Sequence, residues 1–164
     1  MKKVIPGILA LILVAAGLNL PLIKVVSISN RKNVSESIYS RPALQGFVIS
    51  YTHSVNKGRI HDHYVCDGDQ LILEKSVFVS YGAGIPEPEE IADCQFELTE
   101  DGYVLNKLNK RLDSFLMAVG VIAEHSVTIS GKEYFLKNFF PVQTSLRFQV
   151  KRVSAIKLLR TRSF

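Results

Sequence analysis

Short apolar runs alternate with turn residues from Leu44 onward, with the period of two that is typical of β-strands. Phe47, Ile49 and Tyr51 share one face of the first run. Residues 107–123 fit either a short helix or an irregular strand. The pattern predicts a mainly β domain over residues 44–150, an antiparallel β-sandwich or small barrel of about eight strands. Three turn sequences each predict a hairpin: Asp67-Gly68-Asp69, Glu100-Asp101-Gly102 and Ser130-Gly131.

A different pattern precedes this domain. The run from Val4 to Ile23 carries no charge and a single polar side chain, Asn19, and it follows Lys2 and Lys3. Twenty helical residues at about 1.5 Å each span roughly the 30 Å hydrocarbon core of a bilayer. We therefore predict that residues 1–23 are a single-pass transmembrane anchor in the cell membrane. The two lysines favour a cytoplasmic N-terminus and a β domain outside the cytoplasm.

A cleaved signal peptide is the alternative, since Ala15-Ala16-Gly17 offers small residues to a peptidase. Between the apolar run and the domain, residues 24–43 contain Ser, Asn, Lys and Arg with little periodicity and reach Arg41-Pro42. This composition predicts a linker from membrane to domain.

The charge is unevenly distributed. The formal net charge is +5, all fifteen acids lie beyond residue 35, and none follows Glu133. Residues 151–164 therefore form a basic C-terminal segment, predicted to be a solvated tail or to lie against anionic headgroups. Nucleic acid is not a predicted partner, because no recognition motif or mixed basic and aromatic run accompanies the charge.

The two cysteines, Cys66 and Cys94, match neither a zinc spacing nor a CxxC motif. Outside the cytoplasm they could form one disulfide, which would be worth about 3 kcal/mol in the loop-entropy model. Two buried thiols are an equally good interpretation.

Polar chemistry concentrates between Tyr51 and Tyr64, where three of the four histidines fall within fourteen residues. His61 and His63 would share one strand face, and His53 could approach from a neighbouring strand, which is how three imidazoles build an open zinc site. An HxH pair is also common on polar strand faces. We favour no metal site and no cofactor, and name these three histidines as the residues that would bind a metal.

Catalysis has no support in the sequence, and we predict that the protein is not an enzyme. Ser54 is adjacent to His53, and neighbouring side chains on a strand point to opposite faces. The chain has no Gly-x-Ser-x-Gly elbow and no glycine-rich phosphate loop. His125 precedes a predicted strand and is interpreted as structural.

Two motifs together support a family. Tyr51-Thr52-His53-Ser54-Val55 with the nearby Asp62, and Tyr81-Gly82-Ala83-Gly84-Ile85-Pro86, resemble a family of small domains of unknown function associated with TAXI-type tripartite ATP-independent periplasmic (TRAP) transporters. Ala123 to Ile129 is similar to a third region of that family. The resemblance covers roughly residues 44–150. Family members often carry Glu where this chain has Asp62, so the charge is kept on a shorter side chain.

The resemblance implies a location and partners rather than a reaction. It implies a non-catalytic accessory protein that binds the permease or solute-binding subunit of such an uptake system. The alternative is a small-molecule- or metal-binding domain with its site at His53, Asp62, His61 and His63. We expect His53 and Asp62 to pair, beside the glycine loop. The positions carried over as a candidate binding patch are Tyr51, Thr52, His53, Ser54, Asp62, Gly82 and Gly84.

Overall fold

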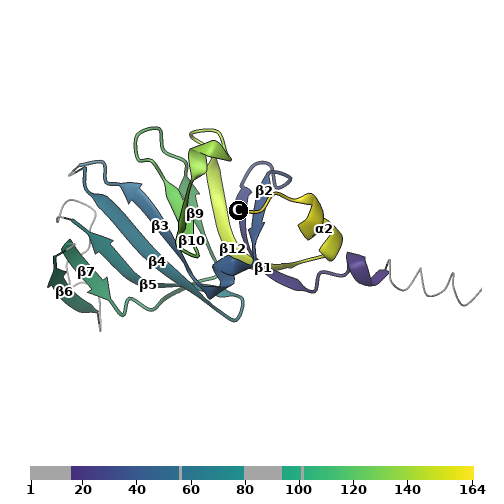
Figure 1. Ribbon diagram of the computed structural model, residues 1–164, viewed down its shortest axis with the longest axis horizontal. Helices are drawn as coiled ribbons and strands as arrows, with labels where there is room; N and C mark the ends of the chain where they lie inside the picture. The colour runs from purple at the N-terminus through teal and green to yellow at the C-terminus, as the bar shows by residue number, and fades with distance from the viewer. Residues whose placement is uncertain (1–15, 56, 80–93, 101) are drawn as a thin grey trace, which may run out of the picture.

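The computed structural model describes residues 16–55, 57–79, 94–100 and 102–164. Over these residues the chain is mainly β, as predicted, and its strands form two antiparallel sheets (Figure 1). One sheet has the order β2-β1-β12-β9, with β1 Ile23–Asn30, β2 Ser37–Ser40, β9 Ser114–Ala118 and β12 Ser145–Val153. The two sheets remain separate, so the small barrel that the sequence also allowed is not formed.

The second sheet has eight strands. Seven follow the order β11-β10-β3-β4-β5-β7-β6, and β8 pairs with β5. Their bounds are β3 Phe47–Thr52, β4 Arg59–Asp67, β5 Gln70–Phe78, β6 Gln95–Thr99, β7 Gly102–Asn106, β8 Lys110–Leu112, β10 Ser126–Ile129 and β11 Lys132–Phe135. The three predicted hairpins are the β4–β5, β6–β7 and β10–β11 connections. Residues 107–123, which the sequence left open, contain strands β8 and β9.

Four aromatic rings join the two sheets. Phe47 and Tyr64 belong to the eight-stranded sheet, and Phe115 and Phe148 to the other. Successive rings stack with centroids 5.2 Å (Phe47–Tyr64), 4.7 Å (Tyr64–Phe115), 4.7 Å (Phe115–Phe148) and 6.3 Å (Phe148–Phe47) apart. These stacked contacts lie in the main core, where inward residues of both sheets bury their apolar surface.

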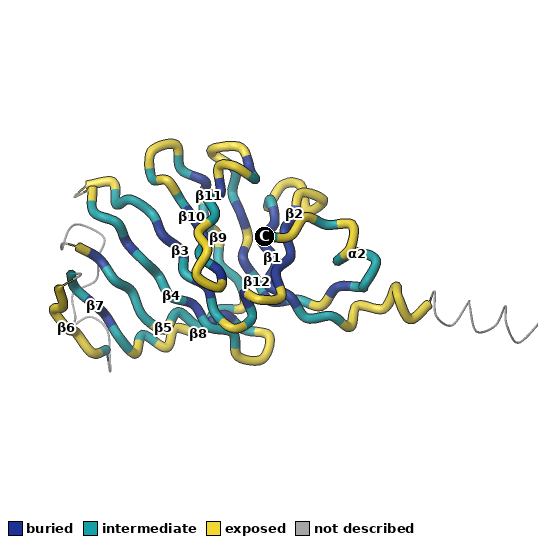
Figure 2. Tube along the Cα trace, viewed as in Figure 1, coloured by how far each residue is buried: buried dark blue, intermediate teal, exposed yellow. Residues whose placement is uncertain are grey.

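The four-stranded sheet covers only part of its partner. Strands β6 and β7 lie at the end of the molecule farthest from β1 and β2, and exposure increases in that direction (Figures 1 and 2). A smaller apolar cluster of Ile60, Phe78 and Leu105 lies between β4, β5 and β7. A third cluster consists of Val25, Tyr39 and Val153, so the described residues form three separate buried regions.

The residues predicted as a linker, 24–43, include most of β1, all of β2 and the start of the 3-10 helix η1 Pro42–Gln45, and the turn between the two strands is irregular. Val26 and Ile28 of β1 enter the main core opposite Val150 and Phe148. The other face of β1 carries Ser27 and Ser29, which are buried although serine suggested a linker. Because small polar side chains can also be buried on a strand face, the serines hid the fact that both faces of β1 are buried.

The basic segment 151–164 also differs from a solvated tail. Its first three residues complete β12, and Ala155–Arg160 forms the short helix α2, with the Ser154 side chain accepting a hydrogen bond from the Lys157 backbone amide. Tyr39 donates its backbone N–H to Arg162 at 3.1 Å, and Phe164 packs on Tyr134 and Phe139.

The predicted anchor lies largely outside the described residues. Residues 16–19 are helical, and β1 begins at Ile23. Within the part of the chain that the structure describes, no helix is long and apolar enough to cross a membrane.

Candidate functional site

The first candidate motif is divided between a strand and a turn. Tyr51 and Thr52 complete β3, whereas His53 and Ser54 lie in the turn that leads to β4. His53 makes two hydrogen bonds that stabilise this turn. Its backbone N–H donates to the Gly58 carbonyl at 2.8 Å, and its side-chain Nδ1 accepts from the backbone N–H of Val55 at 3.3 Å. Ser54 and Val55 are exposed at the tip.

The register of β3 and β4 divides the polar residues of this region between two faces. Asp62 pairs with Ile49, so its side chain lies on the inner face, toward the core. His61 and His63 pair with Ser50 and Val48 and lie on the outer face. The predicted sharing of one strand face by His61 and His63 is thus observed, and Asp62 lies on the other face.

Asp62 has two hydroxyl partners on neighbouring strands. Ser76 Oγ of β5 donates to Asp62 Oδ1 at 2.6 Å, and the Tyr51 hydroxyl donates to the same carboxylate. These contacts replace the predicted pairing of Asp62 with His53. Asp62 is opposite Ile49 in the register, whereas His53 lies beyond Thr52 in the turn.

A small pocket opens beside this carboxylate, between β3, β4 and the edge strand β9, with a volume of about 190 Å³. Tyr51 and His125 form one stacked pair of rings in its wall, with centroids 5.6 Å apart, and Tyr64 and Phe115 form the other. Its lining residues are Ile49, Tyr51, Asp62, Tyr64, Phe115, Leu116, Met117 and His125.

Burial controls protonation in the pocket. It raises the pKa of Asp62, although the hydrogen bonds from Ser76 and Tyr51 partly oppose the shift. Burial also raises the pKa of Tyr51, and it lowers that of His125. The Gly120 backbone N–H donates to His125 Nδ1 at 3.0 Å, so a neutral ring carries its proton on Nε2.

The outer face carries a different network. His61 Nδ1 is 2.8 Å from Ser50 Oγ, and burial lowers the pKa of His61. Arg59 contacts Ser126 Oγ and Glu133 Oε1, both at 3.1 Å, which ties β4 to β10 and β11 across the sheet. These charged and hydroxyl groups form hydrogen bonds and an ion pair with one another, so this network stabilises the arrangement of the strands.

The metal-binding alternative is not supported by the arrangement. His53 lies in a turn, His61 and His63 on the outer face, and Asp62 on the inner face. Among the described residues no three His, Cys, Asp or Glu side chains are grouped as metal ligands. Gly82 and Gly84, with the rest of the glycine loop, lie outside the described residues.

Both cysteines are free thiols. Cys66 packs against the main core, with Sγ 3.7 Å from the Ala43 carbonyl oxygen, and burial raises its pKa. Cys94 packs against the cluster of Ile60, Phe78 and Leu105. Of the two interpretations that the sequence allowed, the structure has the separate thiols.

An exposed apolar rim adjoins the motif. The turn after β3 and the turn after β9 reach the same edge of the molecule (Figure 1), and the Thr52 N–H donates to the Ala123 carbonyl at 2.7 Å. Val55, Val121 and Ile122 are 64%, 62% and 78% exposed. We call these three side chains the apolar rim.

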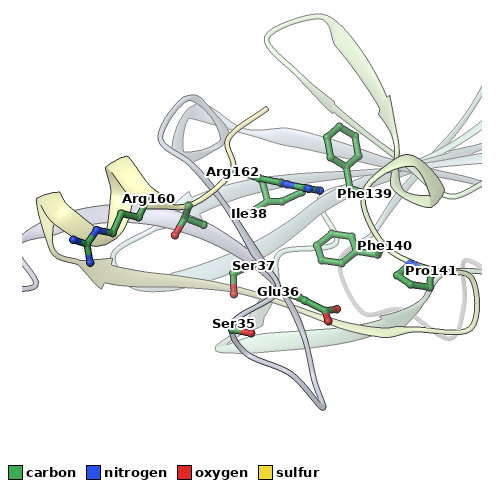
Figure 3. A pocket seen from close by; sticks show the side chains of 10 residues that line it. Ser35, Glu36, Ser37, Ile38, Phe139, Phe140, Pro141, Arg160 and Arg162 are labelled. Atoms are coloured by element: carbon green, nitrogen blue, oxygen red, sulfur yellow. The ribbon is translucent and has the colours of Figure 1, made fainter.

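A further hollow, of about 470 Å³, lies elsewhere, between β2, the turn after η3 (Leu136–Asn138) and the C-terminal segment (Figure 3). Its wall includes the buried Ile38 and Phe140. The Arg162 side chain extends toward Phe139, whereas Arg160 points away (Figure 3). None of the residues predicted as a site lines this hollow.

Residues 47–136 match a domain of unknown function, DUF1850. The chain belongs to this family. Comparison with curated proteins and with solved structures gave no match. The DUF1850 region contains Tyr51, Asp62 and His125, and therefore the pocket. It excludes β1, β2 and β12, which supply most of the sheet that packs against it.

Sequence reasoning identified Tyr51 and Asp62 but missed Ser76 and His125 as their neighbours. One signal was available in the alternation of strand β4. Ile60 and Tyr64 lie on one face of this strand, and Asp62 between them places a carboxylate on that otherwise apolar face. The position of Ser76 beside Asp62 could not be predicted from the sequence. It depends on the register of β4 and β5, which a bulge shifts between His63 and Tyr64.

Proposed function

We propose that this DUF1850 protein is a membrane-anchored, extracytoplasmic accessory protein of a TRAP-type (TAXI) solute uptake system. In this role it docks on the permease or the solute-binding subunit and catalyses no reaction. In this proposal the apolar residues that precede β1 hold it in the membrane as a single-pass anchor. The resemblance of Tyr51-Thr52-His53-Ser54-Val55 and Asp62 to the TAXI-associated family supports this assignment.

The observation that carries the docking role is the apolar rim beside the motif. Three aliphatic side chains exposed on two adjacent turns are an unfavourable surface in water, and such patches are frequently protein contact sites. The two turns are joined by the Thr52–Ala123 hydrogen bond and by Arg59, which donates to the Glu124 carbonyl at 3.0 Å. The rim is therefore held in a defined shape before binding, which lowers the entropy cost of association.

The test is affinity purification of the tagged full-length protein from gently solubilised native membranes, with identification of the proteins that co-elute. We expect a transporter subunit in near-equal amount. The double variant Val121→Asp/Ile122→Asp should lose it, because two charges would be buried in the contact.

Val34→Asp is the matched control, since Val34 is 57% exposed in the β1–β2 turn and does not belong to the rim. It should retain the partner. If the wild-type protein elutes without a transporter subunit, the accessory role is wrong. If the double variant retains the subunit, docking occurs on another surface.

A further inference from the structure

The pocket beside Asp62 contains a carboxylate in mainly apolar surroundings. On the inner face of β4, Asp62 lies between Ile60, which belongs to the smaller cluster, and Tyr64, which belongs to the main core. Its described hydrogen-bond donors are the hydroxyls of Ser76 and Tyr51. A carboxylate has about four acceptor positions, so two donors leave room for more.

No cation of the described residues forms an ion pair with Asp62. The four ion pairs in this part of the chain involve Asp69, Glu133, Asp67 and Glu124. A largely buried carboxylate is normally paired with a positive group or protonated. A bound cation would therefore supply the positive partner that favours the ionised carboxylate of Asp62 in this site.

The walls of the pocket suit the same ligand. Tyr64 and Phe115 line the space but stack on Phe47 and Phe148 in the main core, so the Tyr51–His125 pair supplies the rings for a ligand. Met117 adds a polarizable thioether. Aromatic ring faces attract cations within about 6 Å, and such rings together with a carboxylate recognise ammonium groups. His125 does not oppose a cation, because Nδ1 accepts the Gly120 N–H and the ring is neutral.

We propose that this pocket binds a small organic cation, with its alkylammonium group against Asp62 and beside the Tyr51–His125 pair. The volume of about 190 Å³ equals roughly six water molecules at about 30 Å³ each, so the bound group is small. This inference does not rest on the docking role, because the pocket and the apolar rim are formed by different side chains.

The test compares choline with 3,3-dimethylbutan-1-ol, in which carbon replaces the charged nitrogen and the shape is kept. Binding of each to the full-length protein in an uncharged detergent is measured by calorimetry. We expect choline to bind about tenfold more tightly than the alcohol. Equal affinities, or no binding of choline at millimolar concentrations, would overturn the proposal.

Asp62→Asn removes the charge and keeps the side-chain size, so it should lower choline affinity about tenfold and leave the weak affinity for the alcohol unchanged. Asp67→Asn is the matched control, because Asp67 completes the same strand but pairs with Arg111 outside the pocket. Choline binding to Asp67→Asn should equal that of the wild type. Wild-type choline affinity in Asp62→Asn would refute the site.

A second variant covers a failure of Asp62→Asn to fold, which thermal unfolding would reveal. His125→Leu replaces one ring of the Tyr51–His125 pair by an apolar side chain. It should weaken choline binding several-fold more than binding of the alcohol, because only the cation uses the ring electrons. An equal effect on both molecules would contradict the proposal.

Discussion

At the residue scale, His53 organises the tip of the β3–β4 hairpin rather than pairing with Asp62. Its Nδ1 accepts the Val55 N–H, and Val55 belongs to the apolar rim. We predict that His53→Ala keeps the domain folded, with a loss of about 1 kcal/mol or less, but weakens the partner contact. Thermal unfolding and affinity purification check the two parts.

His53→Asn is the informative companion variant, because asparagine also offers an acceptor to a backbone N–H two residues away. If turn shape is what the partner requires, His53→Asn should retain more partner than His53→Ala. Unfolding of the domain in His53→Ala would mean that the motif is an internal structural device.

A second residue, His63, gives the fold a dependence on pH. Burial, followed by the charges of Lys75 and His61, lowers the pKa of His63 from 6.5 to about 4. Because the folded-state pKa is below the unfolded one, the folded chain binds fewer protons than the unfolded chain in this window. The free energy of unfolding should therefore decrease as the pH falls from about 6.5 toward 4.

Denaturant unfolding at several pH values measures this effect. His63→Gln, which does not titrate, should show a smaller decrease over the same window. His61 and His125 also have lowered pKa values, so part of the decrease should remain in the variant. Identical pH dependence in the wild type and His63→Gln would show that His63 is not responsible.

At the element scale, β1 and β2 belong to the folded unit although they precede the family match. Their buried side chains Val25, Val26, Ile28, Ile38 and Tyr39 are each at most 2% exposed. Each contributes about 1.5–3 kcal/mol on burial, a sum comparable with the whole stability of a domain, about 5–15 kcal/mol.

We therefore predict that a fragment beginning at Pro21 folds and that a fragment beginning at Arg41 does not. Circular dichroism and chemical-shift dispersion of the two purified fragments distinguish these outcomes. A cooperative unfolding transition in the shorter fragment would show that the domain is stable without β1 and β2.

Whether a strand could be predicted from the sequence depended on the residues of the turn beside it. The hairpins at Gly68, Gly102 and Gly131 could be predicted because a glycine beside acidic residues or serine, between alternating runs, is a turn signal. Each of these glycines has positive φ in the structure. Strand β1 could not be predicted, because Ser27 and Ser29 are buried on the face that also carries Val25. Val25 packs with Tyr39, Val153 and Leu158, which come from other elements of the chain.

At the scale of the whole molecule, the main core and the cluster of Ile60, Phe78 and Leu105 predict unequal local stability. The main core joins both sheets, whereas Ile60, Phe78 and Leu105 lie toward the end formed by β6 and β7, and β6 is exposed along its length (Figure 2). Amide hydrogens of β6 should exchange with solvent faster than those of β1 and β12, because local opening there costs less free energy.

Two matched substitutions test this division. Leu146→Ala in the main core should destabilise the whole domain by about 2–5 kcal/mol. Leu105→Ala should mainly accelerate exchange in β6 and β7 and change exchange in β1 and β12 less. Equal acceleration throughout the domain by Leu105→Ala would show that both clusters unfold as one unit.

The sequence by itself determined the β class, the antiparallel hairpins and the region around Tyr51 and Asp62 as the place to look for a site. These features depend on local periodicity and on the backbone needs of turns, which neighbouring residues specify. The tertiary structure decided which face each polar residue occupies and what lies across from it. Ser76 and His125 reach the Asp62 pocket through strand register, a bulge and a turn between sheets, and these depend on contacts between residues far apart in the chain.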